Sequence, residues 1–210
     1  SSTEDGVPDG SRNLMLWDRA TDDRVLLASY WEGAEGVGLS ERYVTWGAFS
    51  ATGKDVFIYD IQTGASTQLE QPGSQYVTAT AGDYLIFMTE ENFTLYHVDL
   101  YRYSTGEVTR LDNGGYSRML PRLDGHLAAW TDYGYSLTTY GGPRDLVVHD
   151  LETGALRRVT TESGTYLGGS LDAGWMIYGL PGSGQYMYDL YAVNLYRAGV
   201  LDEYDHVIPE

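Results

Sequence analysis

Cysteine is absent from the 210-residue sequence, so disulfide bonds and thiolate metal sites are excluded. Lysine is nearly absent: Lys54 is the single lysine among 13 basic residues, which are outnumbered by 30 acidic ones. The formal net charge of −17 repels nucleic acid and anionic lipid, so we expect neither as a partner. No apolar run is long enough to insert into a bilayer.

The sequence also lacks the local motifs of common enzyme classes. It contains no G-x-S-x-G elbow, no P-loop and no G-x-G-x-x-G stretch. Its four histidines, His97, His126, His149 and His206, are not spaced as H-x-x-x-H, so we expect no metal site and no cofactor. The glycine-rich stretch 112–115 lacks the alternating oxygen ligands of a calcium loop.

What the sequence does contain is an internal repeat. The stretch LVVHDLETG at 146–154 recurs closely as VFIYDIQTG at 56–64, with looser copies at 14–19, 95–100 and 190–195. An aspartate or asparagine marks each copy, at steps of 42, 39, 51 and 44 residues: Asp18, Asp60, Asp99, Asp150 and Asn194. A repeat of this length built from short strands is typical of β-propeller blades. We predict that the four aspartates cap turns through their carboxylates.

Each unit is expected to contain four strands, A to D from the channel outward. Complete units are expected at 35–70, 74–111, 115–159 and 164–204, with D strands at 65–69, 107–111, 155–159 and 200–204. An aromatic residue ends each expected B strand, and we expect these rings to form the core between sheets: Trp46, Phe87, Trp130 and Tyr178. His97 and His149 occupy repeat positions, so we interpret them as structural.

The predicted fold is therefore all-β: a propeller of about five blades, each a four-stranded antiparallel sheet, whose first blade is incomplete within the chain. Residues 1–11 are polar and are expected to be a flexible leader, and residues 12–210 a single propeller domain.

The unit at 115–159 resembles the blades of TolB-type propellers. It combines PRLDGHLAAW at 121–130 with DLVVHD at 145–150 and a Thr-Gly pair at 153–154. The resemblance extends over roughly residues 12–204 as a pattern, but the other units lack parts of it. It implies a propeller fold rather than one activity, because such blades serve many functions.

Tyrosine is unusually frequent, with 19 tyrosines against four phenylalanines. Many aromatic residues are expected on the D–A and B–C connections, which emerge on one face of a propeller. They either cap the blade ends or form a platform for a glycan or an extended peptide. The candidate ligand-binding residues are Trp31, Tyr76, Tyr116, Tyr133, Tyr135, Tyr140 and Tyr166, with Arg118 and Arg122.

The hairpin at residues 12–28, from Arg12 to Ala28, is the expected half-blade. Its apolar residues need a partner, and residues 205–210 are too few to supply the two missing strands. We therefore expect this hairpin to bind a protein partner or to mediate self-assembly by strand addition.

Three functions are compatible with the sequence. It favours a non-enzymatic interaction scaffold, which the missing initiator methionine, scarce lysine and abundant tyrosine place outside the cytoplasm, secreted or periplasmic. The first alternative is a carbohydrate-binding, lectin-like propeller that uses the tyrosine-rich face. The second is a propeller lyase or hydrolase with Arg118, Arg122 and His126 at the channel mouth, for which the sequence offers no nucleophile–base pair.

Overall fold

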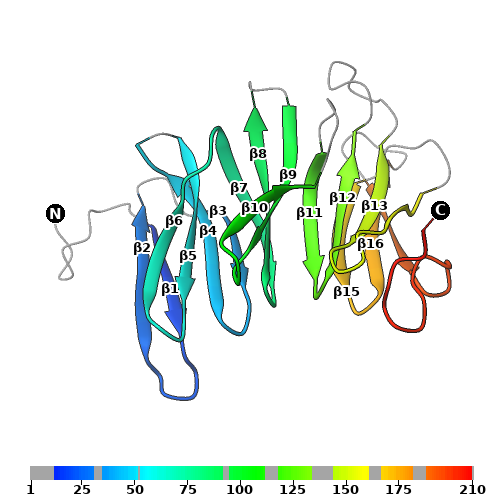
Figure 1. Cartoon of the computed structure of the whole chain (residues 1–210). Helices are drawn as coiled ribbons and strands as arrows, with labels where there is room; N and C mark the ends of the chain where they lie inside the picture. Colours follow the sequence, from blue (N-terminus) through cyan, green and yellow to red (C-terminus); the bar gives the residue numbers. More distant parts are fainter. Residues whose placement is uncertain are drawn as a thin grey trace.

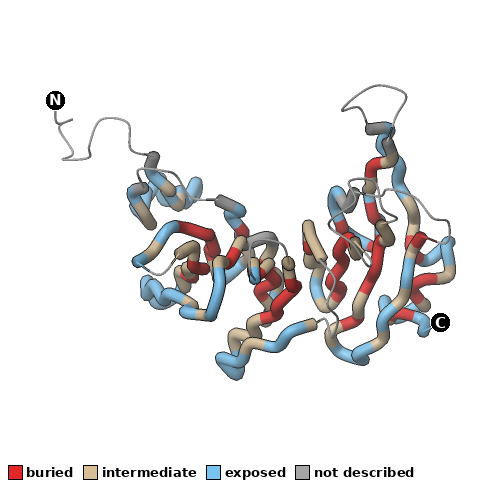
Figure 2. Tube along the Cα trace, turned by 90° about the horizontal axis from the view of Figure 1, so that it is seen from above, coloured by how far each residue is buried: buried red, intermediate tan, exposed pale blue. Residues whose placement is uncertain are grey.

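The computed structural model describes residues 12–30, 35–51, 53–91, 95–111, 118–133, 144–160, 167–181 and 188–209. The regular structure of these residues consists of strands in five antiparallel sheets. The sheets stand side by side (Figure 1) and form an open arc when seen from above (Figure 2). No helix in the described ranges is long and apolar enough to cross a membrane. The prediction of an all-β, propeller-like array of about five sheets is confirmed.

The first two sheets correspond to the expected half-blade and first complete unit. The first sheet pairs β1 (Arg12–Trp17) with β2 (Arg24–Tyr30). The second sheet contains β3 (Glu35–Leu39), β4 (Tyr43–Phe49), β5 (Lys54–Asp60) and β6 (Ala65–Leu69). Each strand pairs with the next one along the chain, as in a propeller blade.

The third and fourth sheets repeat this order. The third contains β7 (Ser74–Ala81), β8 (Tyr84–Glu91), β9 (Leu95–Arg102) and β10 (Glu107–Arg110). The fourth contains β11 (Arg118–Asp124), β12 (Leu127–Asp132), β13 (Asp145–Asp150) and β14 (Leu156–Arg158). The fifth sheet has three strands in the described residues: β15 (Leu167–Asp172), β16 (Trp175–Pro181) and β17 (Tyr188–Asn194).

The expected D strand of the last unit, at 200–204, is not formed. Leu201 instead makes an isolated bridge with Val207. The Asp202 carboxylate accepts hydrogen bonds from the backbone N–H groups of Tyr204 and His206, which folds the chain back on itself. We call residues 195–209 the C-terminal clasp. It buries Leu201 and Val207 against the fourth and fifth sheets, so a local turn replaces the fourth strand.

Apolar side chains on both faces of the inner strands create one core cluster between each pair of neighbouring sheets. In β8, Leu85 and Phe87 face the second sheet whereas Ile86 faces the fourth. In β12, Ala128 and Trp130 face the third sheet whereas Leu127 faces the fifth. Side chains of a strand alternate between its two faces, and here both faces are buried, so the sequences of these strands are continuously apolar. The core is therefore divided among the interfaces between sheets.

The aromatic residues that end the B strands lie in this core, as predicted. Trp46, Phe87 and Trp130 are fully buried, and Tyr178 is half-buried beside the fourth-sheet cluster. The ring of Trp130 also makes an edge contact with the imidazole of His149, whose centroid lies 5.9 Å away. Large rings fill the wide part of the space between sheets and fix their separation.

The predicted turn caps are confirmed at three of the four aspartates: Asp18, Asp60 and Asp150. The Oδ1 atom of Asp60 accepts backbone hydrogen bonds from Gln62 at 2.8 Å and Thr63 at 3.3 Å. Gly64 follows with φ of 70°, a conformation that glycine adopts without steric cost. Asp18 also caps its turn, through the N–H of Ala20 at 2.8 Å.

The prediction for Asp99 is wrong. Strand β9 continues to Arg102, so Asp99 lies inside the sheet opposite Arg110, whose Nε lies 3.3 Å from its carboxylate. In this blade Asp83 takes over the role, since its Oδ1 accepts the N–H of Ser104 at 2.7 Å. The Thr-Gly pair of this repeat comes three residues later than in the closest copies, which moves the turn away from the aspartate.

Replacing Trp130 by alanine is expected to lower the free energy of unfolding by about 3–5 kcal/mol, because a large buried ring would leave a cavity between two sheets. Chemical denaturation followed by far-UV circular dichroism measures this loss. Trp175→Ala is the matched control, since Trp175 is 46% exposed on the outer face of β16. That change should cost less than about 1 kcal/mol. Equal losses for the two variants would contradict the assignment of the core.

Candidate functional site

The first sheet has one packed face and one open apolar face. Leu14 and Leu16 pack on the cluster formed by β4 of the second sheet. Their neighbours in the strand, Met15 and Trp17, point the other way and are 45% and 50% exposed. Leu26, the register partner of Met15, is also 50% exposed. In every inner sheet the equivalent face is covered by a neighbouring sheet. The hairpin therefore exposes a face that would normally pack against another blade.

The opposite end of the arc presents a second open face. In β16, Met176 is buried against the fourth sheet, whereas Trp175 and Ile177 alternate to the outside and are exposed. Leu190 of β17 pairs with Gly179 and is 77% exposed. The ends of the array, far apart in Figure 1, therefore both carry uncovered apolar sheet faces.

Most of the predicted aromatic platform lies outside the described residues: Trp31, Tyr116, Tyr135, Tyr140 and Tyr166. Tyr76 lies three residues into β7 rather than on the preceding connection. Its hydroxyl donates to Glu90 Oε2 at 2.6 Å, and Lys54 Nζ lies 4.8 Å from its ring centroid. The ring of Tyr133 is covered in the same way by the guanidinium of Arg144, at 4.4 Å. A cation thus already covers one face of each described candidate ring.

The two arginines predicted to bind a ligand, Arg118 and Arg122, lie on β11 and connect it to neighbouring strands. Arg118 forms an ion pair with Asp132 on β12, with 3.3 Å between Nε and the carboxylate. Arg122 reaches the next sheet, where its Nε donates to the carbonyl of Gly169 at 2.6 Å. Burial lowers the pKa of Arg122. Since Arg118 begins β11 and His126 follows its end, the strand separates two of the three residues of the predicted catalytic group.

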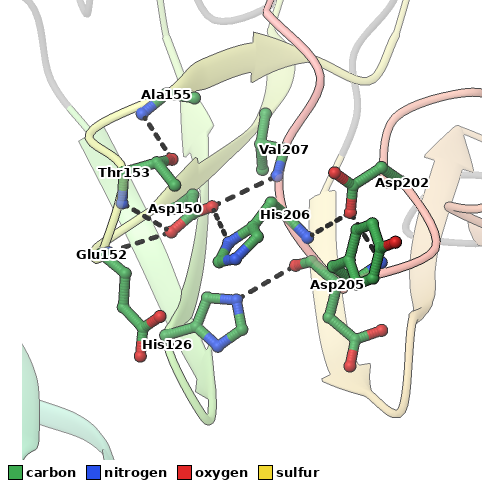
Figure 3. A network of polar contacts seen from close by, with 10 residues as sticks. His126, Asp150, Glu152, Thr153, Ala155, Asp202, Asp205, His206 and Val207 are labelled. Carbon is green, nitrogen blue, oxygen red and sulfur yellow. Dashed lines mark hydrogen bonds and ion pairs between the residues drawn. The ribbon is translucent and has the colours of Figure 1, made fainter.

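A polar network that the sequence did not reveal joins the fourth sheet to the C-terminal clasp (Figure 3). The fully buried carboxylate of Asp150 uses Oδ1 to cap its own turn, accepting the N–H groups of Glu152 at 2.9 Å and Thr153 at 3.1 Å. Its Oδ2 accepts Nδ1 of His206 at 2.9 Å and the N–H of Val207 at 3.3 Å. One side chain therefore stabilises two segments that are distant in the sequence.

His126 completes this region from the turn between β11 and β12. Its Nε2 lies 3.0 Å from the backbone carbonyl of Asp205, and its ring centroid lies 5.4 Å from that of His206. The carboxylate of Glu152 is exposed beside the two rings (Figure 3). The cluster of His126, Glu152 and His206 is formed by three separate segments of the chain. The spacing of these residues in the sequence therefore could not predict it. The repeat of aspartates to which Asp150 belongs predicted only that it caps its turn.

The protonation of this network follows from its contacts. Burial alone would raise the pKa of Asp150, but hydrogen bonds from Thr153, Glu152 and His206 outweigh it and lower the pKa to about 2. The contribution of Asp150 to stability is thus present above about pH 4 and is lost as the pH falls toward 2. The hydrogen bond to Asp150 raises the pKa of His206. Its contribution is thus complete below pH 6.5 and is lost as the pH rises through the raised value.

The other two histidines lie within strands, at the repeat positions from which a structural role was predicted. The imidazole of His97 is buried in β9 and lies 3.0 Å from Glu91 Oε2. His149 lies against Trp130 in β13, and burial lowers its pKa.

Asp150→Ala is expected to lower the free energy of unfolding by about 3–5 kcal/mol, because it leaves several donors and a histidine without their buried acceptor. Asp60→Ala is the matched control: it removes the same cap from the second sheet, but that carboxylate pairs only with Arg42 of the same sheet and, among the described residues, holds no segment outside it. Urea denaturation should show a clearly smaller loss for this variant. Similar losses at both sites would mean that Asp150 acts only as a turn cap.

Comparison with known proteins gives the fold of the chain. No family model and no curated protein matches the sequence. Oligogalacturonate lyase in complex with manganese matches with a TM-score of 0.60 and 17% identity, over 91% of this chain and 59% of the lyase. The propeller domain of the Trilobed protease from Pyrococcus furiosus, which has an open velcro topology, matches with a TM-score of 0.61 and 11% identity, over 88% and 60%.

TolB from Acinetobacter baumannii matches with a TM-score of 0.50 and 14% identity, over 79% of this chain and 45% of TolB. The chain thus spans between 45% and 60% of the length of these three structures. At such identities the likeness concerns the fold alone. It confirms the resemblance to TolB-type propellers.

Proposed function

We propose that the chain is a non-enzymatic β-propeller scaffold that binds protein through the open face of its first sheet. The observation that carries this proposal is the uncovered blade interface on β1 and β2, where Met15, Trp17 and Leu26 are each about half exposed. Side chains of this type are buried at every interface between the inner sheets. A contiguous apolar face of this kind is typical of a protein interaction site.

The occupant that best fits this face is the other end of a second copy of the chain. The exposed face of β15–β17, with Trp175, Ile177 and Leu190, is what a further sheet presents when a propeller array continues. The first sheet has two strands in the described residues, and its open edge can also accept strands from the neighbour. Because the two faces differ, copies would join head to tail, which builds a ring or a filament.

The charge of the chain sets the conditions for such assembly. A net charge of −17 makes two copies repel each other, and salt screens this repulsion over about 10 Å at 0.1 M. Arg24 and Arg19 lie 5.3 and 5.8 Å from the ring of Trp17, so this patch combines apolar area with positive charge in an acidic protein. Because salt screens the repulsion between two copies of net charge −17, association should strengthen as salt is added.

The two alternative functions have less support. Carbohydrate stacking needs open ring faces, and the described rings of Tyr76 and Tyr133 each have a cation over them. A lyase or hydrolase needs convergent charged groups. Arg118 is paired with Asp132, while Arg122 bonds the carbonyls of Pro121 and Gly169. We place the scaffold outside the cytoplasm, because the composition combines scarce lysine with abundant tyrosine.

Light scattering coupled to size-exclusion chromatography tests the proposal over a range of concentrations and salt. The wild type is expected to form oligomers at moderate salt, whereas Trp17→Glu should be monomeric with an unchanged melting temperature. Tyr204→Glu is the matched control, because Tyr204 is 71% exposed on the clasp, away from both sheet faces. It should assemble like the wild type.

A folded monomer at all concentrations, with the amides of β1 protected from hydrogen exchange, would contradict this function. Assembly that tolerates Trp17→Glu would move the interface elsewhere.

A further inference from the structure

We propose that His126, Glu152 and His206 form a binding site for a divalent transition-metal ion, of which zinc is the representative. One ligand atom from each side chain lies within 4.8 Å of the other two. The three residues come from the β11–β12 turn, the turn after β13 and the C-terminal clasp. The proposal is independent of the interaction function, because the site lies on the turns rather than on an open sheet face.

Each imidazole has a hydrogen-bond acceptor beside one of its ring nitrogens. The Nδ1 atom of His206 lies 2.9 Å from the carboxylate of Asp150, which only accepts, so the neutral ring donates there. The Nε2 atom of His126 faces the carbonyl of Asp205, again an acceptor, at 3.0 Å. Each neutral ring therefore keeps the lone pair on its other nitrogen. A carboxylate or carbonyl behind the ligating histidine is the usual outer shell of a metal site.

The set of ligands points to zinc rather than to calcium or magnesium. Two imidazole nitrogens and one carboxylate oxygen suit zinc and similar ions, whereas calcium and magnesium prefer oxygen ligands alone. Ligand atoms on a tetrahedral zinc ion lie about 3.4 Å apart, given bond lengths of about 2.0–2.2 Å. The three ligand atoms lie within 4.8 Å of one another, so binding requires side-chain rotations that bring them closer, and Glu152 is exposed.

The surroundings of the cluster also favour a cation. Asp150, Asp202 and Asp205 lie within the same network as the three ligands (Figure 3). Three protein ligands leave the fourth position of a tetrahedral ion for water. An ion bound here would join the clasp to the turns of the fourth sheet and would stabilise the fifth sheet, which has three strands in the described residues.

Isothermal titration of the metal-free 210-residue chain with zinc chloride, at mildly alkaline pH, tests this site. The wild type is expected to bind one zinc ion per chain, and Glu152→Gln should weaken binding at least about 10-fold. Glu203→Gln is the matched control, because Glu203 is an exposed acid on the clasp outside the cluster, and the charge change is the same. It should bind zinc like the wild type.

Cobalt substitution gives a second readout that does not depend on affinity. A cobalt ion held by two imidazoles should show visible absorption bands that are lost in His126→Gln and His206→Gln. Circular dichroism of these variants without metal checks that they fold, and Glu152→Gln decides the question if either does not.

Bound zinc should also raise the melting temperature of the wild type but not of Glu152→Gln. Failure of the wild type to bind zinc at one equivalent, or equal binding by Glu152→Gln and the wild type, would overturn the proposal.

Discussion

The structure depends on the packing of apolar side chains on both faces of the middle sheets. Strands such as β8 and β12 place alternate residues into two different interfaces, so each sheet is held by its neighbours rather than by one central core. Burial of large aliphatic and aromatic side chains contributes about 1.5–3 kcal/mol each, and the interfaces contain many of them. The same requirement leaves the two end sheets with an exposed face, because each has a second apolar face that no sheet of the described residues covers.

Much of this architecture could be predicted from the sequence, because the repeat makes each unit evidence for the others. A buried ring at the end of each B strand appears as an aromatic residue at equivalent positions, as with Trp46 and Trp130. Turns could also be predicted from the sequence, because Asp60 and its Thr-Gly pair form a turn through contacts within a few residues. Where pattern and local chemistry agreed, the structure followed them.

The failures have physical reasons that a linear pattern does not contain. Residues 200–204 look like a strand, but Asp202 binds backbone N–H groups beyond it and turns the chain instead. The histidine cluster depends on three segments meeting in space, and nothing in the spacing of His126 and His206 indicates that they meet. The open apolar face on β1 and β2 was predictable, because its apolar residues alternate within one short hairpin.

The sheet-by-sheet organisation of the core also determines how the molecule comes apart. In a row of units that contact only their neighbours, stability is a sum of nearest-neighbour terms, and loss of structure begins at the ends. The two ends of this array are not equivalent in that respect. At one end a hairpin is held by a single interface, whereas at the other the clasp is anchored through Asp150, inside the preceding sheet. Unfolding should therefore begin at the hairpin, which can detach alone. Separation of the last sheet also requires breaking the hydrogen bonds between the clasp and the buried carboxylate of Asp150.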